Sequence, residues 1–209
     1  DFWQYNPITD SWTQKTTFPF GARSSAFGFG INGNGYVCLG QDGVVQKSDL
    51  WQYDPQLDSW VQKANYGGNS RILPSGFVIG GKAYVGTGRE LTSTAGHNDF
   101  WAYDTNTNTW SQITDFPADF RAAAGYFTIN GYGYIQGGYN HTTTLAYSDL
   151  WKYTSDQVGM EVANPNIDWA CYPNPVINLL NVQVRDTEIQ YISLIDINGK
   201  EILKVNINK

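Results

Sequence analysis

A short aromatic motif recurs about every 50 residues along the chain, and this repeat constrains the fold more than any other feature. The motif begins at Asp1, Asp49, Asp99 and Asp149. From Asp49 it reads DLWQYDPQLDSW, in which two tryptophans flank an Asp-Pro turn. A period of this length predicts a row of similar units, each of which buries its apolar face against its neighbour.

Further residues recur in the same phase. A tryptophan ends the motif, an arginine follows it, and a tyrosine follows the arginine. These residues are Trp12, Trp60 and Trp110, then Arg23, Arg71 and Arg121, then Tyr36, Tyr84 and Tyr134. Gly, Asn, Asp and Pro lie between short apolar runs, where turns require them. Each unit therefore predicts four short strands, and no stretch has the period of an amphipathic helix.

The third strand of each unit is apolar on both faces. Trp51 and Tyr53 share one face because side chains alternate along a strand, and Leu50 lies on the other. An antiparallel sheet with one solvated face would show polar residues at alternate positions instead. Four-stranded sheets covered on both sides are typical of β-propeller blades. We therefore expect the paired tryptophans to pack one blade onto the next.

Residues 1–155 resemble the kelch repeat, through Trp51–Pro55, Trp60, and Tyr134 with Gly137 and Gly138. The resemblance implies an all-β fold, a partial kelch-type β-propeller of about three and a half blades of four antiparallel strands. It also implies that these blades are a fragment of a larger ring. The double glycine is intact only in the third unit, and no fourth-strand tryptophan follows Trp151. We expect the last blade to take its fourth strand from the N-terminal end of the chain.

The repeat stops after Asp156, and the sequence predicts a linker over residues 156–170. Residues 171–209 alternate in the manner of strands, and Asn198-Gly199 predicts a hairpin turn. This segment resembles the C-terminal sorting domain of proteins exported by the type IX secretion system. The residues that carry the resemblance are Tyr172, Pro173, Asn174 and Pro175, followed by Leu194–Lys200 with Asp196 and Gly199.

The sorting-domain resemblance implies the N-terminal half of an immunoglobulin-like β-sandwich. It also implies the type IX secretion machinery as a partner, and release from or anchoring to the surface of a Gram-negative bacterium. The alternative is an ordinary C-terminal β-sandwich without a sorting role. About 40 residues are few for a sandwich core of their own.

Candidate binding residues come from the loops between the second and third strands, because ligand contacts tend to lie on variable loops held by a rigid scaffold. Within these loops we single out Glu90, His97, Tyr139 and His141. The repeated arginines Arg23, Arg71 and Arg121 have two interpretations. They either pin loop carbonyls or form a ring that binds acidic sugars.

The leading functional hypothesis is a secreted or cell-surface module that binds a protein or a glycan. The alternative is a carbohydrate-active enzyme of the sialic acid epimerase or galactose oxidase type, and a third hypothesis is a piece of an adhesin without a small ligand. A net charge of −6 argues against a nucleic-acid partner. No apolar run predicts a membrane-spanning segment. The sequence indicates no catalytic residue, metal site or cofactor, because no known motif links its histidines and acids.

Overall fold

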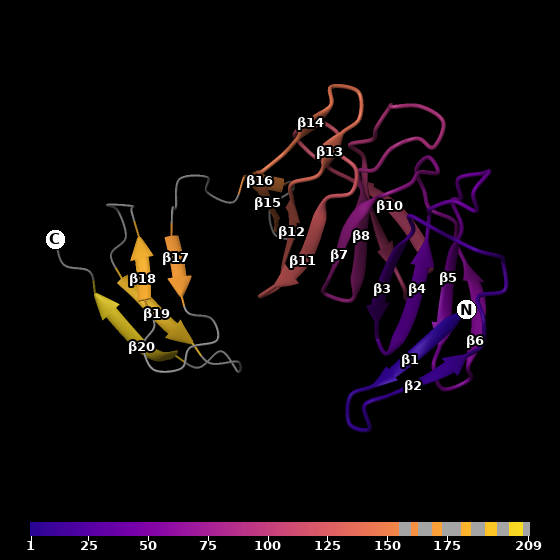
Figure 1. Cartoon of the computed structure of the whole chain (residues 1–209), viewed down its shortest axis with the longest axis horizontal. Coiled ribbons are helices and arrows are strands. Elements are labelled where there is room, and N and C mark those ends of the chain that lie inside the picture. Colours follow the sequence, from indigo (N-terminus) through magenta and orange to yellow (C-terminus); the bar gives the residue numbers. More distant parts are fainter. Residues whose placement is uncertain (155–159, 163–168, 173–180, 185–190, 196–200, 207–209) are drawn as a thin grey trace. The chain divides into compact units, whose positions relative to one another are not determined.

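The chain is built from antiparallel β-strands (Figure 1). The computed structural model describes residues 1–154, 160–162, 169–172, 181–184, 191–195 and 201–206, with side chains for residues 1–154. Every regular element within these residues is a strand, as the repeat predicts. The chain divides into two compact units, Asp1–Ala163 and Asn164–Lys209.

The first unit opens with two strands that we call the N-terminal hairpin. They are β1 (Phe2–Asn6) and β2 (Ser11–Lys15), paired antiparallel with Tyr5 opposite Trp12. In the phase of the repeat they correspond to the third and fourth strands of a blade. The motif that begins at Asp1 thus folds as the second half of a blade.

Three four-stranded sheets follow, which we call the first, second and third blades. The first holds β3 (Phe27–Ile31), β4 (Asn34–Cys38), β5 (Leu50–Asp54) and β6 (Ser59–Lys63). The second holds β7 (Ser75–Ile79), β8 (Lys82–Gly86), β9 (Phe100–Asp104) and β10 (Thr109–Ile113). The third holds β11 (Gly125–Ile129), β12 (Tyr132–Gln136), β15 (Leu150–Tyr153) and β16 (Met160–Val162). Together with the N-terminal hairpin, these antiparallel meanders form a partial β-propeller.

The third blade differs from the sequence-based expectation in its outer strand. We expected a strand from the N-terminal end of the chain, but β16 pairs with β15, with Val162 opposite Trp151. The expectation relied on a missing tryptophan, whereas a strand ladder is made by backbone groups that every residue supplies. Part of the predicted linker 156–170 therefore lies in strands, namely β16 and the start of β17 (Trp169–Tyr172).

The second unit contains two hairpins in its described residues. β17 (Trp169–Tyr172) pairs with β18 (Asn181–Val184), and β19 (Tyr191–Ile195) pairs with β20 (Glu201–Asn206). The strands predicted around these positions are present. The predicted Asn198-Gly199 turn lies outside the described residues, and so do Pro173, Asn174, Pro175 and Asp196. The immunoglobulin-like sandwich stays a prediction.

The apolar core lies between the blades. One buried cluster joins the first and second blades, with Leu50 and Tyr66 on one side and Val85 and Tyr103 on the other. A second cluster joins the second and third blades through Phe77, Phe100, Phe116, Ile135 and Tyr153. Leu50 and Trp51 are both buried although they face opposite sides of β5. This confirms that both faces of a blade are covered.

The fourth-strand tryptophans join neighbouring blades through the backbone as well as through their rings. Trp60 donates its indole N–H to the carbonyl of Thr16, and the N–H of Thr16 donates to Asp58. One blade later, Trp110 donates to the carbonyl of Ala64, and the N–H of Ala64 donates to Asn108. Each pair thus holds the backbone N–H and C=O of one residue in the segment that crosses from the preceding blade. We call these segments crossing segments.

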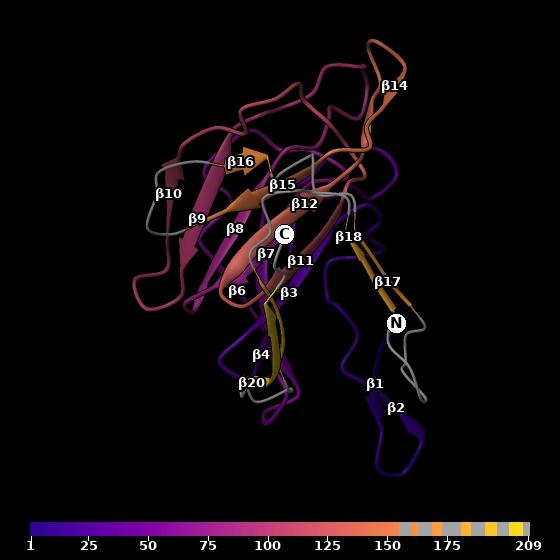
Figure 2. The same ribbon diagram turned by 90° about the vertical axis from the view of Figure 1, so that its left-hand side faces the viewer.

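The loops between second and third strands and the turns between third and fourth strands lie at opposite ends of the sheets. The loops between second and third strands, including the small hairpin β13 (Tyr139–Asn140) and β14 (Leu145–Ala146), gather at one end, and the β1–β2 turn lies at the other (Figures 1 and 2). We call the first of these the loop end. Near it, Gly40 donates its N–H to the carbonyl of Arg71, and Gly88 does the same to Arg121. Both glycines have positive φ and lie too close to neighbouring backbone for a Cβ.

Inter-blade packing predicts unequal costs for two tyrosines at the same phase of the repeat. Tyr103 is 1% exposed and Tyr5 is 43% exposed. Tyr103→Ala should lower the free energy of unfolding by about 3 to 5 kcal/mol, because it leaves a cavity between blades. Tyr5→Ala should cost about 1 kcal/mol or less. Urea denaturation measures both, and equal losses would contradict the assignment of the core.

Candidate functional site

Each repeated arginine forms a bidentate ion pair with the aspartate that immediately precedes the third strand. In the second blade, Arg71 donates to the two carboxylate oxygens of Asp99 at 2.8 and 2.9 Å. The same guanidinium donates to the carbonyl of Thr87, and Asp99 also accepts the indole N–H of Trp101. The first and third blades repeat the set with Arg23, Asp49 and Trp51, and with Arg121, Asp149 and Trp151.

These arginines lie inside the scaffold. The side chains of Arg71 and Arg121 are fully buried, and that of Arg23 is 6% exposed. The guanidinium of Arg71 packs over the ring of Tyr66, and that of Arg121 packs over Phe116. The expected contact with loop carbonyls is present. None of the three guanidinium groups lies at the surface, where an acidic sugar would meet it.

The aspartates are charged partners of these buried cations. Burial alone would raise the pKa of Asp99, but the hydrogen bond and charge of Arg71 and the hydrogen bond from Trp101 outweigh it, and the pKa is lowered. The pKa values of Asp49 and Asp149 are lowered for the same reasons, by Arg23 with Trp51 and by Arg121 with Trp151. The carboxylates thus remain ionised through the neutral range.

A polar pair closes the base of each loop at the loop end, which the sequence did not reveal. The pairs are Asp42 with Lys47, Glu90 with His97, and Asn140 with Tyr147. The second members of the three pairs occupy equivalent positions in their blades. Lys47, His97 and Tyr147 all donate their backbone N–H to the carbonyl of an equivalent glycine. The position is thus structural, while its chemistry differs in every blade. Only the spacing of two residues before the repeated aspartate could have indicated it.

Glu90 departs from the pattern of the two other loops. Asp42 and Asn140 turn their oxygens back to cap backbone N–H groups of their own loops. The longer side chain of Glu90 instead reaches His97 Nε2 at 2.8 Å with one oxygen and Gln46 of the neighbouring loop at 2.6 Å with the other. The structure therefore brings Glu90 and His97 together, as two of the predicted site residues.

The environment of His97 favours the neutral imidazole. Burial lowers its pKa first, and the nearby charge of Arg71 lowers it further, while the hydrogen bond to the Glu90 carboxylate and its charge act in the opposite direction. His97 Nδ1 also lies 4.0 Å from Asp99. A neutral, half-buried histidine beside a partly exposed carboxylate is able to accept or donate a proton near neutral pH.

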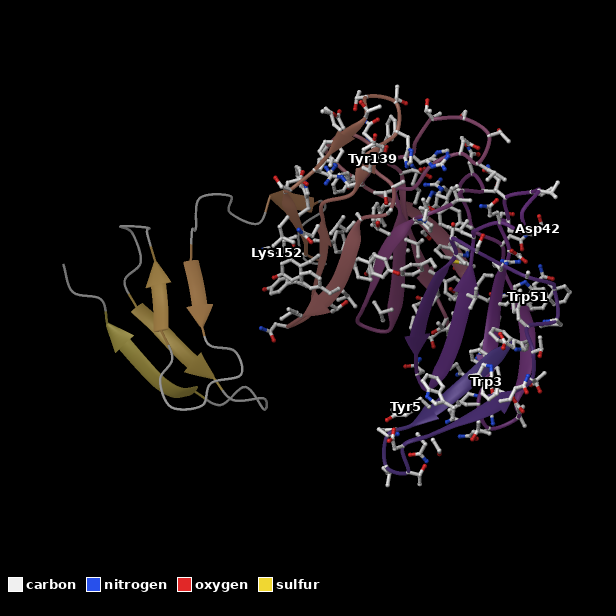
Figure 3. The ribbon with its side chains drawn as sticks, viewed as in Figure 1. Trp3, Tyr5, Asp42, Trp51, Tyr139 and Lys152 are labelled. Atoms are coloured by element: carbon white, nitrogen blue, oxygen red, sulfur yellow. The ribbon has the colours of Figure 1, made fainter. Side chains whose placement is uncertain are left out.

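Tyr139 and His141 form a second group on the loop of the third blade. Their rings meet edge to face with centroids 4.8 Å apart. Thr142, the next residue, donates to the carbonyl of Thr94 in the loop of the second blade. Figure 3 shows Tyr139 at the loop end, and it shows Trp3 and Tyr5 on the N-terminal hairpin. The four predicted loop residues thus lie on two neighbouring loops that touch.

In the part of the chain with described side chains, no group of three or more His, Cys, Asp or Glu residues is arranged so that it could hold a metal ion. Cys38 is a buried free thiol on β4, and burial raises its pKa.

The chain was compared with protein families, with curated proteins and with solved structures. Residues 170–209 match the model of a family described as a secretion system C-terminal sorting domain. No match was found among the curated proteins. Among solved structures, the chain is similar to that of YjhT, with a TM-score of 0.63 and 21% identity over 74% of this chain and 56% of that one. The chain thus spans little more than half of YjhT, and at this identity the similarity shows the fold alone.

The buried ion pairs generate a prediction with a matched control. Asp99→Asn leaves the fully buried Arg71 without a counter-charge and should cost about 3 to 5 kcal/mol at pH 7. Asp1→Asn changes the same position of the repeat, where Asp1 accepts the indole N–H of Trp3 and pairs with no arginine within residues 1–154, and should cost about 0.5 kcal/mol or less. Chemical denaturation of the two variants measures the difference.

The sign of the pH dependence follows from the lowered pKa of Asp99. Its contribution to stability is complete above its unfolded pKa of about 3.9 and is lost as the pH falls through the lower folded value. The gap between wild type and Asp99→Asn should therefore be constant from pH 5 to 7 and shrink below about pH 4. A gap that widens on acidification would contradict this assignment.

Proposed function

We propose that this chain is a secreted or cell-surface propeller module that recognises a glycan or a protein through its loop end and is exported by the type IX secretion system of a Gram-negative bacterium. The single observation behind the binding role is the contrast between scaffold and loops. The ion pairs and the third-strand tryptophans repeat in all three blades, whereas the loop-closing pairs change from Asp-Lys to Glu-His to Asn-Tyr. A repeated frame with unlike loops is the usual arrangement of a binding surface.

Support for export comes from the match of residues 170–209 to a secretion sorting domain. The residues that carried the type IX resemblance, such as Tyr172 and Gly199, fall within that range. In the part of the chain that the structure describes, no helix is long and apolar enough to cross a membrane. Attachment to the surface or release would then follow from processing by the secretion machinery.

The kelch-type assignment of the propeller belongs to this proposal. The repeated glycine ending of the second strand, the third-strand Trp-x-Tyr-Asp and the fourth-strand tryptophan all support it. The glycines at 40, 88 and 138 have positive φ, which explains their place in the repeat. Fold alone fixes no ligand, so the residues of the loop end carry the functional argument.

Glu90 and His97 favour one second candidate, a carbohydrate-active enzyme of the epimerase type. Their side chains are 28% and 14% exposed and 2.8 Å apart, and the imidazole is held neutral. Such a pair would transfer protons to and from a sugar. Arg71 and Arg121, which an acidic-sugar site would use, are buried in ion pairs, and this weighs toward binding without catalysis.

Glycan binding to the loop end can be tested with the full chain on a glycan array. Tyr139→Ala and His141→Ala should reduce binding at least tenfold if their rings stack on sugar, and Leu57→Ala, which is 74% exposed in a turn at the opposite end, should leave it unchanged. Loss with Leu57→Ala alone would place recognition elsewhere. Turnover of an acidic sugar that His97→Gln abolishes would favour the enzyme.

Export predicts a separate result. Deletion of residues 170–209 should retain the chain inside a bacterium that has a type IX secretion system, while the complete chain reaches the surface or the medium. Fractionation followed by immunodetection measures the distribution. A matched control is the exposed substitution Leu57→Ala, which should not alter export. Equal export of the truncated chain would contradict the sorting role.

A further inference from the structure

The loop of the second blade, residues 89–98, has a described neighbour on both sides. The first and third blades pack against the second through the two buried clusters. The loop itself bonds to the loop of the first blade through Gln46 and Glu90, and to the loop of the third blade through Thr94 and Thr142. The surroundings of Glu90 are therefore those of a loop with both neighbours in place, and they indicate which ligand it would bind.

Glu90 differs from Asp42 and Asn140, which stand at the same position of the repeat, in what its oxygens accept. Asp42 uses one oxygen for two backbone N–H groups and the other for Lys47. The side-chain oxygen of Asn140 likewise accepts two backbone N–H groups. Each oxygen of Glu90 accepts one hydrogen bond, from His97 or from the neighbouring loop, so each keeps one of its two acceptor sites.

Two side chains fix the direction of the Glu90 carboxylate. Gln46 donates to it and, through the same amide nitrogen, to the carbonyl of Ser70, while its amide oxygen accepts the N–H of Leu91. A carboxylate only accepts hydrogen bonds, so the proton of the neutral imidazole lies on His97 Nε2, which faces Glu90. Gln46 and His97 are thus positioning residues. The side chain of Glu90 is twice as exposed as that of His97, at 28% against 14%, and is the group that a ligand meets.

The charges around this carboxylate sum to zero. Behind His97 lies the ion pair of Arg71 with Asp99, and His97 Nδ1 is 4.0 Å from Asp99. Arg89 balances the charge of Glu90, but its guanidinium is directed into its own loop, where Nη1 donates to two loop carbonyls and Nε is buried. An acidic ligand would therefore meet the carboxylate of Glu90 and be repelled by it. A site of this kind suits an uncharged ligand that donates hydrogen bonds.

We infer that Glu90 binds two adjacent hydroxyls of an uncharged sugar, with one hydroxyl donating to each carboxylate oxygen. The inference rests on the proposed binding role of the loop end and narrows its ligand to a neutral glycan. Hydrogen bonds from hydroxyls to a carboxylate are roughly twice as strong as those between neutral groups. The rings of Tyr139 and His141 lie on the loop that touches this one and offer an apolar surface to a sugar ring.

An array of neutral, carboxylated, sulfated and amino-bearing glycans, probed with the full chain, tests the inference. Binding should be to neutral glycans. Glu90→Gln should weaken it at least tenfold, because the amide replaces an acceptor oxygen with a donor. Asp104→Asn is the matched control and should leave binding unchanged. It removes one negative charge from the same blade at the opposite end of the sheet, and the repeat itself carries Asn6 at that position.

The two positioning residues have tests of their own. His97→Gln keeps an N–H donor and should retain more binding than His97→Ala. Gln46→Ala should weaken binding severalfold with Glu90 unchanged. Titration of the strongest neutral glycan of the array into the full chain labelled with ¹⁵N should shift the side-chain amide signal of Gln46 and the Nε2–H signal of His97 saturably, which a purely structural role would not do.

The outcomes separate this inference from the proposed function. Binding confined to charged glycans, or equal binding by wild type and Glu90→Gln, would overturn the inference. If Tyr139→Ala abolishes binding while Glu90→Gln does not, the binding role of the loop end stands without it. A chain that binds no glycan also overturns it and leaves protein recognition to the loop end. Urea denaturation checks that the variants fold, and Glu90→Asp, which keeps the charge but lacks the reach, should also bind at least tenfold more weakly.

Discussion

The ion pair between a crossing arginine and the aspartate of the next third strand is the interaction on which the blade array depends. A buried guanidinium is stable only with a counter-charge and filled hydrogen bonds, and Arg71 obtains both from Asp99, Asn69 and Thr87. The same carboxylate holds the indole of Trp101. One aspartate thus fixes the segment that enters a blade and the tryptophan on which that segment packs.

Because these ion pairs hold the blades together, the loops between second and third strands can differ in sequence from blade to blade. The pairs at the loop bases keep one position and change their chemistry, and the loops also bond to one another through Gln46 with Glu90 and through Thr142 with Thr94. Adjacent loops therefore form one surface supported by the ion pairs beneath it. Such a surface accepts new side chains at little cost to the frame, which suits the binding role that we propose.

Much of the fold was predictable because it is periodic. The phase of Trp51, Trp60 and their copies predicted the blades and their two apolar faces. The strand β16 escaped prediction because backbone pairing leaves no side-chain signal at Met160–Val162. For the arginines, the sequence left two roles open, since the partner of Arg71 lies 28 residues further on at Asp99, and only the fold brings the two together.

The candidate site was predictable in part. Glu90 and His97 were chosen because they do not repeat, and they do meet. The loop-closing role of that position was hidden, because Lys47, His97 and Tyr147 share a place and no chemistry. Tyr139 and His141 were likewise found to touch each other on the neighbouring loop. Differences between the repeats thus identified the candidate residues in the sequence. The position that Lys47, His97 and Tyr147 share could be recognised only in the structure.

Hydrogen exchange of the indole N–H groups, read by NMR on the full chain, tests the central account most directly. The account predicts slow exchange for Trp51, Trp101 and Trp151, which bond to the aspartates, and for Trp60 and Trp110, which bond to crossing carbonyls. It predicts fast exchange for Trp12, which has the same place in the repeat and is 65% exposed. Fast exchange at Trp60 and Trp110, equal to that of Trp12, would contradict it.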